Sequence, residues 1–197
     1  NEALMPADLR AAFIQSVQTN AGVDYRATLD ASGRANFEHP TQKFVATIDA
    51  GAVHVKPSGP LPWRFSLSTS SLGCSGEAGK PPVVANVLTT NNRVRIDRDG
   101  VHEWYVHGPL GLEQGFTVDR APDCRGTKVV SIAVNGNVLP RLDDADRDGR
   151  GQTISLLDHE GTQVARYTDL YVKDARGKRV AAWFGVTDNE MRLHWDD

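Results

Sequence analysis

Apolar and polar residues alternate along most of this chain, and no other feature constrains its fold as strongly. The alternation is clearest where Trp63, Phe65 and Leu67 are separated by Arg64 and Ser66. It recurs in the segments 53–56, 93–97, 130–134, 154–156 and 191–195. Side chains of a β-strand point to its two faces in turn, so the pattern predicts strands with one buried and one solvated face.

Turn signals separate the predicted strands. Asn135-Gly136 favours a type I′ hairpin, because both residues tolerate a positive φ. Asp99-Gly100 is expected to join two strands, and the segments 158–161 and 174–177 look like longer hairpin loops that each begin with Asp and end with Gly. Many short strands separated by turns predict a mainly β fold, which we expect to be an antiparallel β-sandwich.

One segment near the N-terminus is predicted to be an α-helix. Leu9, Phe13 and Val17 are four residues apart and share one helix face. Pro6 suits the first turn of such a helix. We therefore expect one N-terminal helix within residues 1–22, packed on the sheet that follows.

The rest of the chain is predicted to be one domain. At 197 residues the chain is within the range of single all-β domains, so residues 23–197 are expected to form one large β-sandwich. The segment 70–92 is rich in Gly, Pro and Asn. It is expected to be a long surface excursion from the sheets.

Composition excludes several classes of protein. Lys and Arg number 22 and Asp and Glu number 25, so the net charge of -3 gives no electrostatic reason to expect a nucleic-acid partner. No apolar run approaches the roughly 20 residues needed to cross a bilayer, so membrane insertion is not expected. Hydrophobic residues make up 40% of the chain, which is enough for a folded core.

The two cysteines indicate a compartment. Cys74 and Cys124 both lie in turn-rich segments rather than in apolar runs, whereas an unpaired structural cysteine is usually buried. The sequence therefore predicts a Cys74–Cys124 disulfide, and two unrelated free thiols are the alternative. A disulfide would indicate a secreted or periplasmic protein.

An acidic loop is the sharpest local motif. Asp144, Asp146 and Asp148 stand at alternate positions before Gly149, which is how an EF-hand calcium loop begins. The acid expected at loop position twelve is replaced by Ser155. Two interpretations stay open: a solvated acidic hairpin loop, and a calcium site with these three aspartates as ligands.

Trp104 is the candidate for sugar recognition. Trp104-Tyr105 places one ring on each face of a predicted strand, and an exposed ring on a sheet can stack on a pyranose. A two-layer core explains the same residues. No Ser lies in a Gly-x-Ser-x-Gly elbow, and we assign no catalytic residue.

The segment 92–117 resembles a known module. It holds Glu-Trp-Tyr at 103–105 and Gly-Pro-Leu-Gly-Leu-Glu-Gln-Gly-Phe at 108–116. These motifs resemble a β-rich module near the amino terminus of large secreted bacterial proteins, where it often precedes FG-GAP (integrin-α-like) repeats. The resemblance implies an extracellular location and a structural or adhesive role, and it carries no catalytic residues. Within the motif, Glu113 and Gln114 either bond a neighbouring loop or line a pocket.

Two functions are therefore expected from the sequence. The first is a secreted, non-enzymatic structural, adhesive or surface-scaffold module whose partners are other extracellular proteins or polysaccharide. The second is a carbohydrate-binding module or a carbohydrate-active enzyme built on a β-sandwich. Whether the chain is an enzyme is left open, with a non-enzyme favoured.

Overall fold

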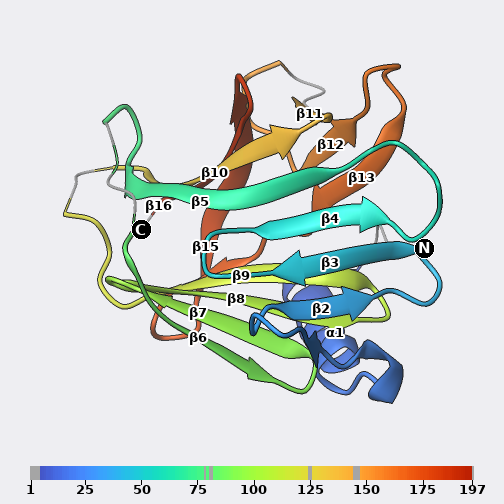
Figure 1. Cartoon of the computed structure of the whole chain (residues 1–197). Coiled ribbons are helices and arrows are strands. Elements are labelled where there is room, and N and C mark those ends of the chain that lie inside the picture. Colours follow the sequence, from blue (N-terminus) through green and yellow to red (C-terminus); the bar gives the residue numbers. More distant parts are fainter. Residues whose placement is uncertain (1–4, 78, 80–81, 124–125, 144–146, 197) are drawn as a thin grey trace. The chain divides into compact units, whose positions relative to one another are not determined.

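The chain is mainly β with antiparallel strands and one N-terminal α-helix, which confirms the predicted fold class (Figure 1). The computed structural model describes residues 5–77, 79, 82–123, 126–143 and 147–196. Contacts divide the chain into two compact units, Asn1–Pro62 with Val83–Arg120 and Trp63–Pro82 with Ala121–Asp197. The single domain over 23–197 stays a prediction, and each unit is described by itself.

The first unit contains two antiparallel meanders. One is made of β1 (Thr28–Leu29), β2 (Ala35–Glu38), β3 (Phe44–Ile48) and β4 (Val53–Pro57). The other is made of β6 (Val84–Thr90), β7 (Arg93–Arg98), β8 (Val101–Gly108) and β9 (Gly111–Val118). Each strand pairs with the next along the chain, so short turns suffice. The Asp99-Gly100 turn joins β7 to β8 as predicted, with Gly100 at a φ of 75°.

Buried side chains form the core of this unit. Along β7, Val94 and Ile96 are buried while Arg93 and Arg95 are exposed, as the alternation predicts. Phe37 of β2 is buried, and its ring centroid lies 5.0 Å from that of His107 in β8. The inward faces of the two meanders therefore meet.

Helix α1 (Ala7–Thr19) packs against β8, but not through the face that its apolar spacing suggested. Leu9 is 57% exposed and Phe13 is 47% exposed, whereas Gln18 is 1% exposed. The Gln18 amide donates to the carbonyls of Val106 and Gly111 and accepts from the Leu110 N–H. These backbone groups need partners once buried, so the helix turns a polar side chain inward. A short 3-10 helix, η2 (Val23–Tyr25), follows.

The second unit contains a five-strand arrangement and a three-stranded sheet. The first runs in the order β5 (Phe65–Cys74), β10 (Lys128–Gly136), β16 (Glu190–Asp196), β15 (Arg179–Thr187) and β14 (Val172–Lys173). The second holds β11 (Leu139–Leu142), β12 (Thr153–Leu157) and β13 (Gln163–Thr168). Tyr167 of β13 contacts the buried Phe184 of β15, with ring centroids 5.4 Å apart. Through that contact the three-stranded sheet packs against the five-strand arrangement and shares its core.

The predicted Asn135-Gly136 hairpin is wrong. Both residues pair with β5, and the next strand, β11, belongs to the other sheet. Gly136 has a φ of 117°, and a Cβ there would overlap the Arg64 carbonyl. The glycine is used for the close approach of two strands rather than for a two-residue turn.

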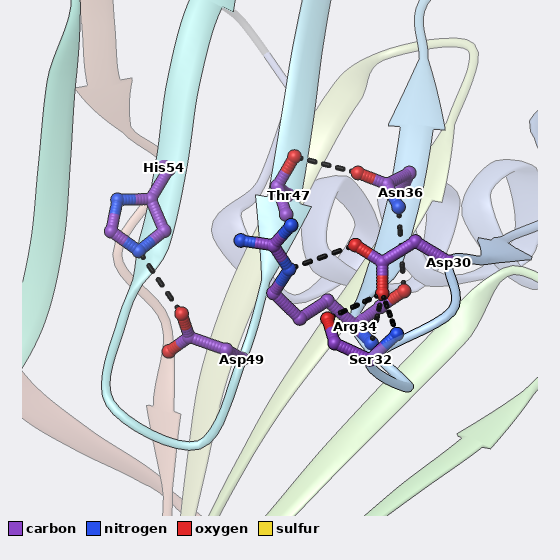
Figure 2. Close-up of polar contacts among 7 residues, drawn as sticks. All are labelled: Asp30, Ser32, Arg34, Asn36, Thr47, Asp49 and His54. Atoms are coloured by element: carbon purple, nitrogen blue, oxygen red, sulfur yellow. Dashed lines mark hydrogen bonds and ion pairs between the residues drawn. The ribbon is translucent and has the colours of Figure 1, made fainter.

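A recurrent Asp-x-x-Gly turn closes several hairpins, including the two predicted at 158–161 and 174–177. Another such turn begins at Asp30. The Asp30 carboxylate accepts hydrogen bonds from the Ser32 N–H (2.9 Å), the Ser32 hydroxyl (2.7 Å) and Arg34 Nε (2.8 Å), as Figure 2 shows. The Ser32 hydrogen bond is the main cause that lowers the pKa of Asp30, and bonds from Arg34 add to it. Figure 2 also shows neighbouring polar pairs, Thr47 with Asn36 and His54 with Asp49.

The expected excursion at 70–92 is strand at both ends. β5 continues to Cys74, and β6 begins at Val84. Two groups of described residues in this segment lie outside strands. One is the connection between β5 and β6, and the other is the β6–β7 turn at Asn91 and Asn92. Glycine-rich composition therefore did not prevent pairing, because Gly73 pairs with Val129 of β10.

Candidate functional site

A row of polar residues crosses the second unit from strand to strand. Ser71 of β5 pairs with Ser131 of β10, which pairs with Arg192 of β16, which pairs with Gly185 of β15. Directly opposed residues of neighbouring strands place their side chains on the same face. The register therefore gathers two hydroxyls and a guanidinium on one face of the sheet.

A β-bulge adds a further hydroxyl to this face. The pairing of β5 with β10 shifts between Ser131 and Ile132, so Ser70 is an extra residue beside Ser71. A bulge sets two residues against one on the partner strand and redirects a side chain. Ser70 and Ser71 accordingly both line the same cavity.

The cavity has a volume of about 550 Å³ and is lined mainly by polar residues. This volume is in the range of small-molecule sites. Besides the row itself, the chain that follows β5 contributes to the lining, and Gly79 lies against Ser71 and Gly73. The lining residues are Ser70, Ser71, Cys74, Ser75, Gly76, Glu77, Gly79, Val129, Ser131, Glu190, Arg192 and His194.

Glu190 organises the polar groups of the cavity. It accepts a hydrogen bond from the Ser70 hydroxyl (2.9 Å) and another from Arg192 Nε (3.0 Å). Burial alone would raise the pKa of Glu190. Hydrogen bonds from Arg192, Ser70 and Ser131, together with the Arg192 charge, outweigh the effect of burial and lower the pKa. The carboxylate is therefore ionised at neutral pH. It orients hydroxyl protons of the serines toward itself and leaves their oxygen lone pairs as acceptors.

Arg192 keeps donors for a ligand. Its Nε is used by Glu190, and within the described part of the chain its terminal nitrogens have no hydrogen-bond partner. Arg192 is one of the lining residues, so these donors are available to a ligand in the cavity.

His194 is held in a stack at one end of the cavity. Its ring lies 5.5 Å from that of Trp183 at an interplanar angle of 11°, and the Arg150 guanidinium lies 4.1 Å from the Trp183 ring centroid. Burial is the main cause that lowers the pKa of His194, and the charges of Arg192 and Arg150 lower it further while Asp196 opposes them. The imidazole is therefore neutral and contributes a flat surface more than a charge.

The cavity can recognise a polar molecule better than it can activate one. Ser70 and Glu190 are within hydrogen-bond distance, as a nucleophile and its base must be. A general base works best with a pKa near the operating pH, whereas the pKa of Glu190 is lowered. The arrangement suits binding through hydroxyl, carboxylate and guanidinium groups.

The predicted Trp104 lies in the first unit, on the outer face of β8. Its indole covers Gly115 of β9, where a Cβ would overlap the ring, and the Arg93 guanidinium lies 4.6 Å from the ring centroid. Glu113, on the same face of β9, is partly buried, and burial raises its pKa while the Arg93 charge opposes the rise. Trp104 thus packs on its neighbours, and a sugar would have to displace Arg93 to stack on it.

Gln114 points to the opposite face of β9 and joins a buried network. Its amide donates to Glu103 Oε1 (2.8 Å) and to the Tyr105 hydroxyl (3.0 Å). Glu103 is 1% exposed and also receives bonds from Tyr105 and Arg98. The two Gln114 bonds are made to core side chains, and both roles expected for Gln114 stay predictions.

The remaining predicted residues are only partly described. Cys74 ends β5 and lines the cavity, while Cys124 lies outside the described residues, so the disulfide stays a prediction. Asp144 and Asp146 also lie outside them, and Asp148 accepts a bond from the Arg150 N–H (2.9 Å). Within the described ranges no group of three His, Cys, Asp or Glu side chains is placed to hold a metal, and the calcium loop stays a prediction.

The cavity residues themselves were not predicted. No role was predicted for the serines, Glu190 or Arg192, because a polar sheet face has the same sequence pattern whether it is flat or hollow. The available signal was the hydroxyl-rich stretch Ser66–Ser71, which runs from the alternating segment into the expected excursion at 70–92.

Comparisons with protein-family models, with curated proteins and with solved structures found no match to this chain. No helix among the described residues is long and apolar enough to cross a membrane.

Proposed function

We propose that this protein is a non-catalytic binding module and that the cavity of its second unit takes a neutral saccharide. One observation carries the proposal: the serines of the bulged strand, the ionised Glu190 and the available Arg192 donors line one cavity of about 550 Å³. A polyhydroxyl ligand offers both donors and acceptors, and this lining offers their complements.

The charges of the lining favour a neutral ligand. Glu77, Glu190 and Arg192 are the ionised residues in it, since the His194 imidazole is neutral. Arg192 is already paired with Glu190. An anion would meet the Glu77 carboxylate and a cation would meet the Arg192 guanidinium, whereas sugar hydroxyls can bond to each of these groups.

The wider setting of the module is proposed from the sequence. The resemblance of 92–117 to modules of secreted bacterial proteins and the predicted cysteine pair support an extracellular location. A saccharide-binding, non-enzymatic module in that location would act in adhesion or as a surface scaffold. Polysaccharide is then the partner that agrees with both the cavity and the setting.

The test is a glycan array followed by calorimetry on the bound glycan. We expect Arg192→Ala to weaken binding by about tenfold or more, because charge-assisted hydrogen bonds are lost. Trp104→Ala, in the other unit, is the matched control and should bind within about twofold of wild type. Circular dichroism confirms that both variants fold.

Two results would overturn the proposal. One is the absence of binding to every glycan on the array. The other is a loss of binding in Trp104→Ala with none in Arg192→Ala, which would move the site to the outer face of β8.

A further inference from the structure

Two fully buried histidines meet in the first unit, away from any role described so far. His39, just after β2, and His107 of β8 are each 0% exposed, and their ring centroids lie 5.3 Å apart. The rings of Tyr25, Phe37 and Phe44 surround them. Histidine is the side chain whose charge changes most readily near neutral pH, so its burial here has consequences.

The hydrogen bonds of His39 require a neutral ring. Nδ1 accepts from the backbone N–H groups of Thr41 (3.3 Å) and Gln42 (3.1 Å). Nε2 therefore carries the proton and donates to the Gly108 carbonyl (3.1 Å). A second proton would have to go to Nδ1, where it would face two N–H donors.

His107 has no acceptor for a second proton either. Nδ1 donates to the Tyr25 carbonyl (3.0 Å), so Nε2 is the unprotonated nitrogen. Nε2 is buried and has no hydrogen-bond partner in the described part of the chain. Protonation would place an unpaired N–H and a charge in the core, which is strongly unfavourable.

Among the residues that the structure describes, no neighbouring carboxylate is placed to compensate such a charge. The titratable side chains facing the imidazoles are each other and Tyr25. From β8 the nearest acid on the inward face is Glu103, whose carboxylate is already bonded by Arg98, Tyr105 and Gln114.

In the described part of the chain, the other elements around the pair add no buried charge. Helix α1 contributes the neutral Gln18, and β2 and β3 contribute Phe37 and Phe44. The charged residues of η2 and of the adjoining segments are exposed: Asp24, Arg26, Glu38 and Lys43.

The same pair fixes two segments to the end of β8. His39 ties the turn before β3 to Gly108, and His107 ties η2 through Tyr25. Asn92 extends the arrangement to the helix, because its amide donates both to the Gln18 carbonyl (2.8 Å) and to the His107 carbonyl (2.7 Å). The N-terminal segment is thus held where the imidazoles lie.

We propose that His39 and His107 form an acid-sensitive latch that holds α1 and η2 on β8 while both imidazoles are neutral and releases them in acid. Burial is the main cause that lowers the pKa of both histidines. The closed state is therefore fully stable above the ordinary histidine pKa of about 6.5 and loses stability as the pH falls below it. Each proton taken up on opening makes opening up to about tenfold more favourable per pH unit.

Hydrogen exchange of the full chain, read by mass spectrometry, tests the latch. We expect protection of residues 7–25, corrected for intrinsic exchange, to fall by about tenfold or more between about pH 7.5 and pH 5. The double variant His39→Asn with His107→Asn keeps an acceptor and a donor near the Nδ1 positions but does not titrate. Its protection should not depend on pH, whereas His54→Asn, an exposed histidine on β4, should behave as wild type.

Three outcomes would overturn the latch. These are pH-independent protection in wild type, an equal response in the double variant, and a response that the His54→Asn variant removes. Should the double variant not fold, nuclear magnetic resonance titration of the wild-type imidazoles decides instead. The assigned signals of His39 and His107 must then titrate below the ordinary value together with the loss of protection, and ordinary titration of these two imidazoles would refute the latch.

Discussion

Among single residues, Glu103 shows how polar chemistry is used inside this protein. Its carboxylate is bonded by Arg98, Tyr105 and Gln114 and is almost wholly removed from solvent. A buried ion pair adds little net stability, yet removal of one partner leaves the other charge unpaired. The network therefore specifies how β7, β8 and β9 pack in the core.

A substitution of Glu103 tests this role. Glu103→Gln should lower the free energy of unfolding by about 3 kcal/mol, because the buried Arg98 guanidinium loses its counter-charge. Urea denaturation measures the loss. The control is Asp97→Asn on the outer face, whose partner Arg95 is exposed and whose loss should cost less than about 1 kcal/mol. Equal losses in the two variants would contradict the buried role of Glu103.

The sequence predicted the alternation of buried and solvated residues, but not which polar residues line a cavity. Trp104 and Glu113 were candidates for ligand binding, with packing roles as the alternative, and the indole lies between Gly115 and Arg93. Alternation shows that a side chain leaves the core, and it does not show what covers that side chain. Glu190 and Ser70, 120 residues apart in the chain, come together through strand register, which no local pattern encodes.

At the scale of elements, the hairpins were predicted best because their signals are local. Asp158 and Asp174 each accept backbone N–H bonds from the residues two and four positions later, and Asp30 does the same. The glycine that follows each takes a φ near 80°. The Asn135-Gly136 prediction failed because the same residue types also serve a close contact between strands of one sheet.

The glycine of one such turn is a test of this turn chemistry. Gly177 has a φ of 79°, so Gly177→Ala should destabilise the protein by about 1 to 2 kcal/mol through backbone strain. Thermal unfolding measures the loss. Gly22 has a φ of -66° and no atom within 4 Å of a built Cβ, so Gly22→Ala should change stability by less than about 0.5 kcal/mol. A neutral Gly177→Ala would mean that the turn does not need a glycine.

The N-terminal helix shows where a helical pattern misleads. Two stripes of residues have the spacing of a helix face, and in the more apolar one Leu9 and Phe13 are exposed while Val17 is half-buried. The stripe that contains Ile14 and Gln18 packs inward, since the buried amide satisfies the turn between β8 and β9. The spacing of residues alone could not predict that the hydrogen-bonded amide of Gln18, rather than the Phe13 ring, would be buried against the sheet.

In the whole molecule, the chain leaves the second unit and returns to it. Residues 83–120 belong to the first unit, and the second unit holds the chain on both sides of them. Cys74 precedes this segment and Cys124 follows it. The predicted disulfide would therefore join the outgoing and returning chain within one unit and close a loop that contains β6 to β9.

Reduction measures the contribution of that disulfide. Closure of a loop of about 50 residues should raise the free energy of unfolding by roughly 4 kcal/mol, so reductant should lower stability by that amount. The non-reduced protein should not react with a thiol-alkylating reagent, as intact mass shows. The double variant Cys74→Ser with Cys124→Ser is the control, in which reductant has no effect. Two alkylated thiols before reduction would refute the disulfide.

The same chain path sets the order in which the protein can be completed during synthesis. The apolar faces of β2 and β3, with Phe37 and Ile48, are made before residue 62, but the meander that covers them ends only at Val118. At roughly 5 to 20 residues per second, that face stays uncovered for several seconds after it leaves the ribosome. We therefore expect the first unit to complete its fold only after β6 to β9 have emerged.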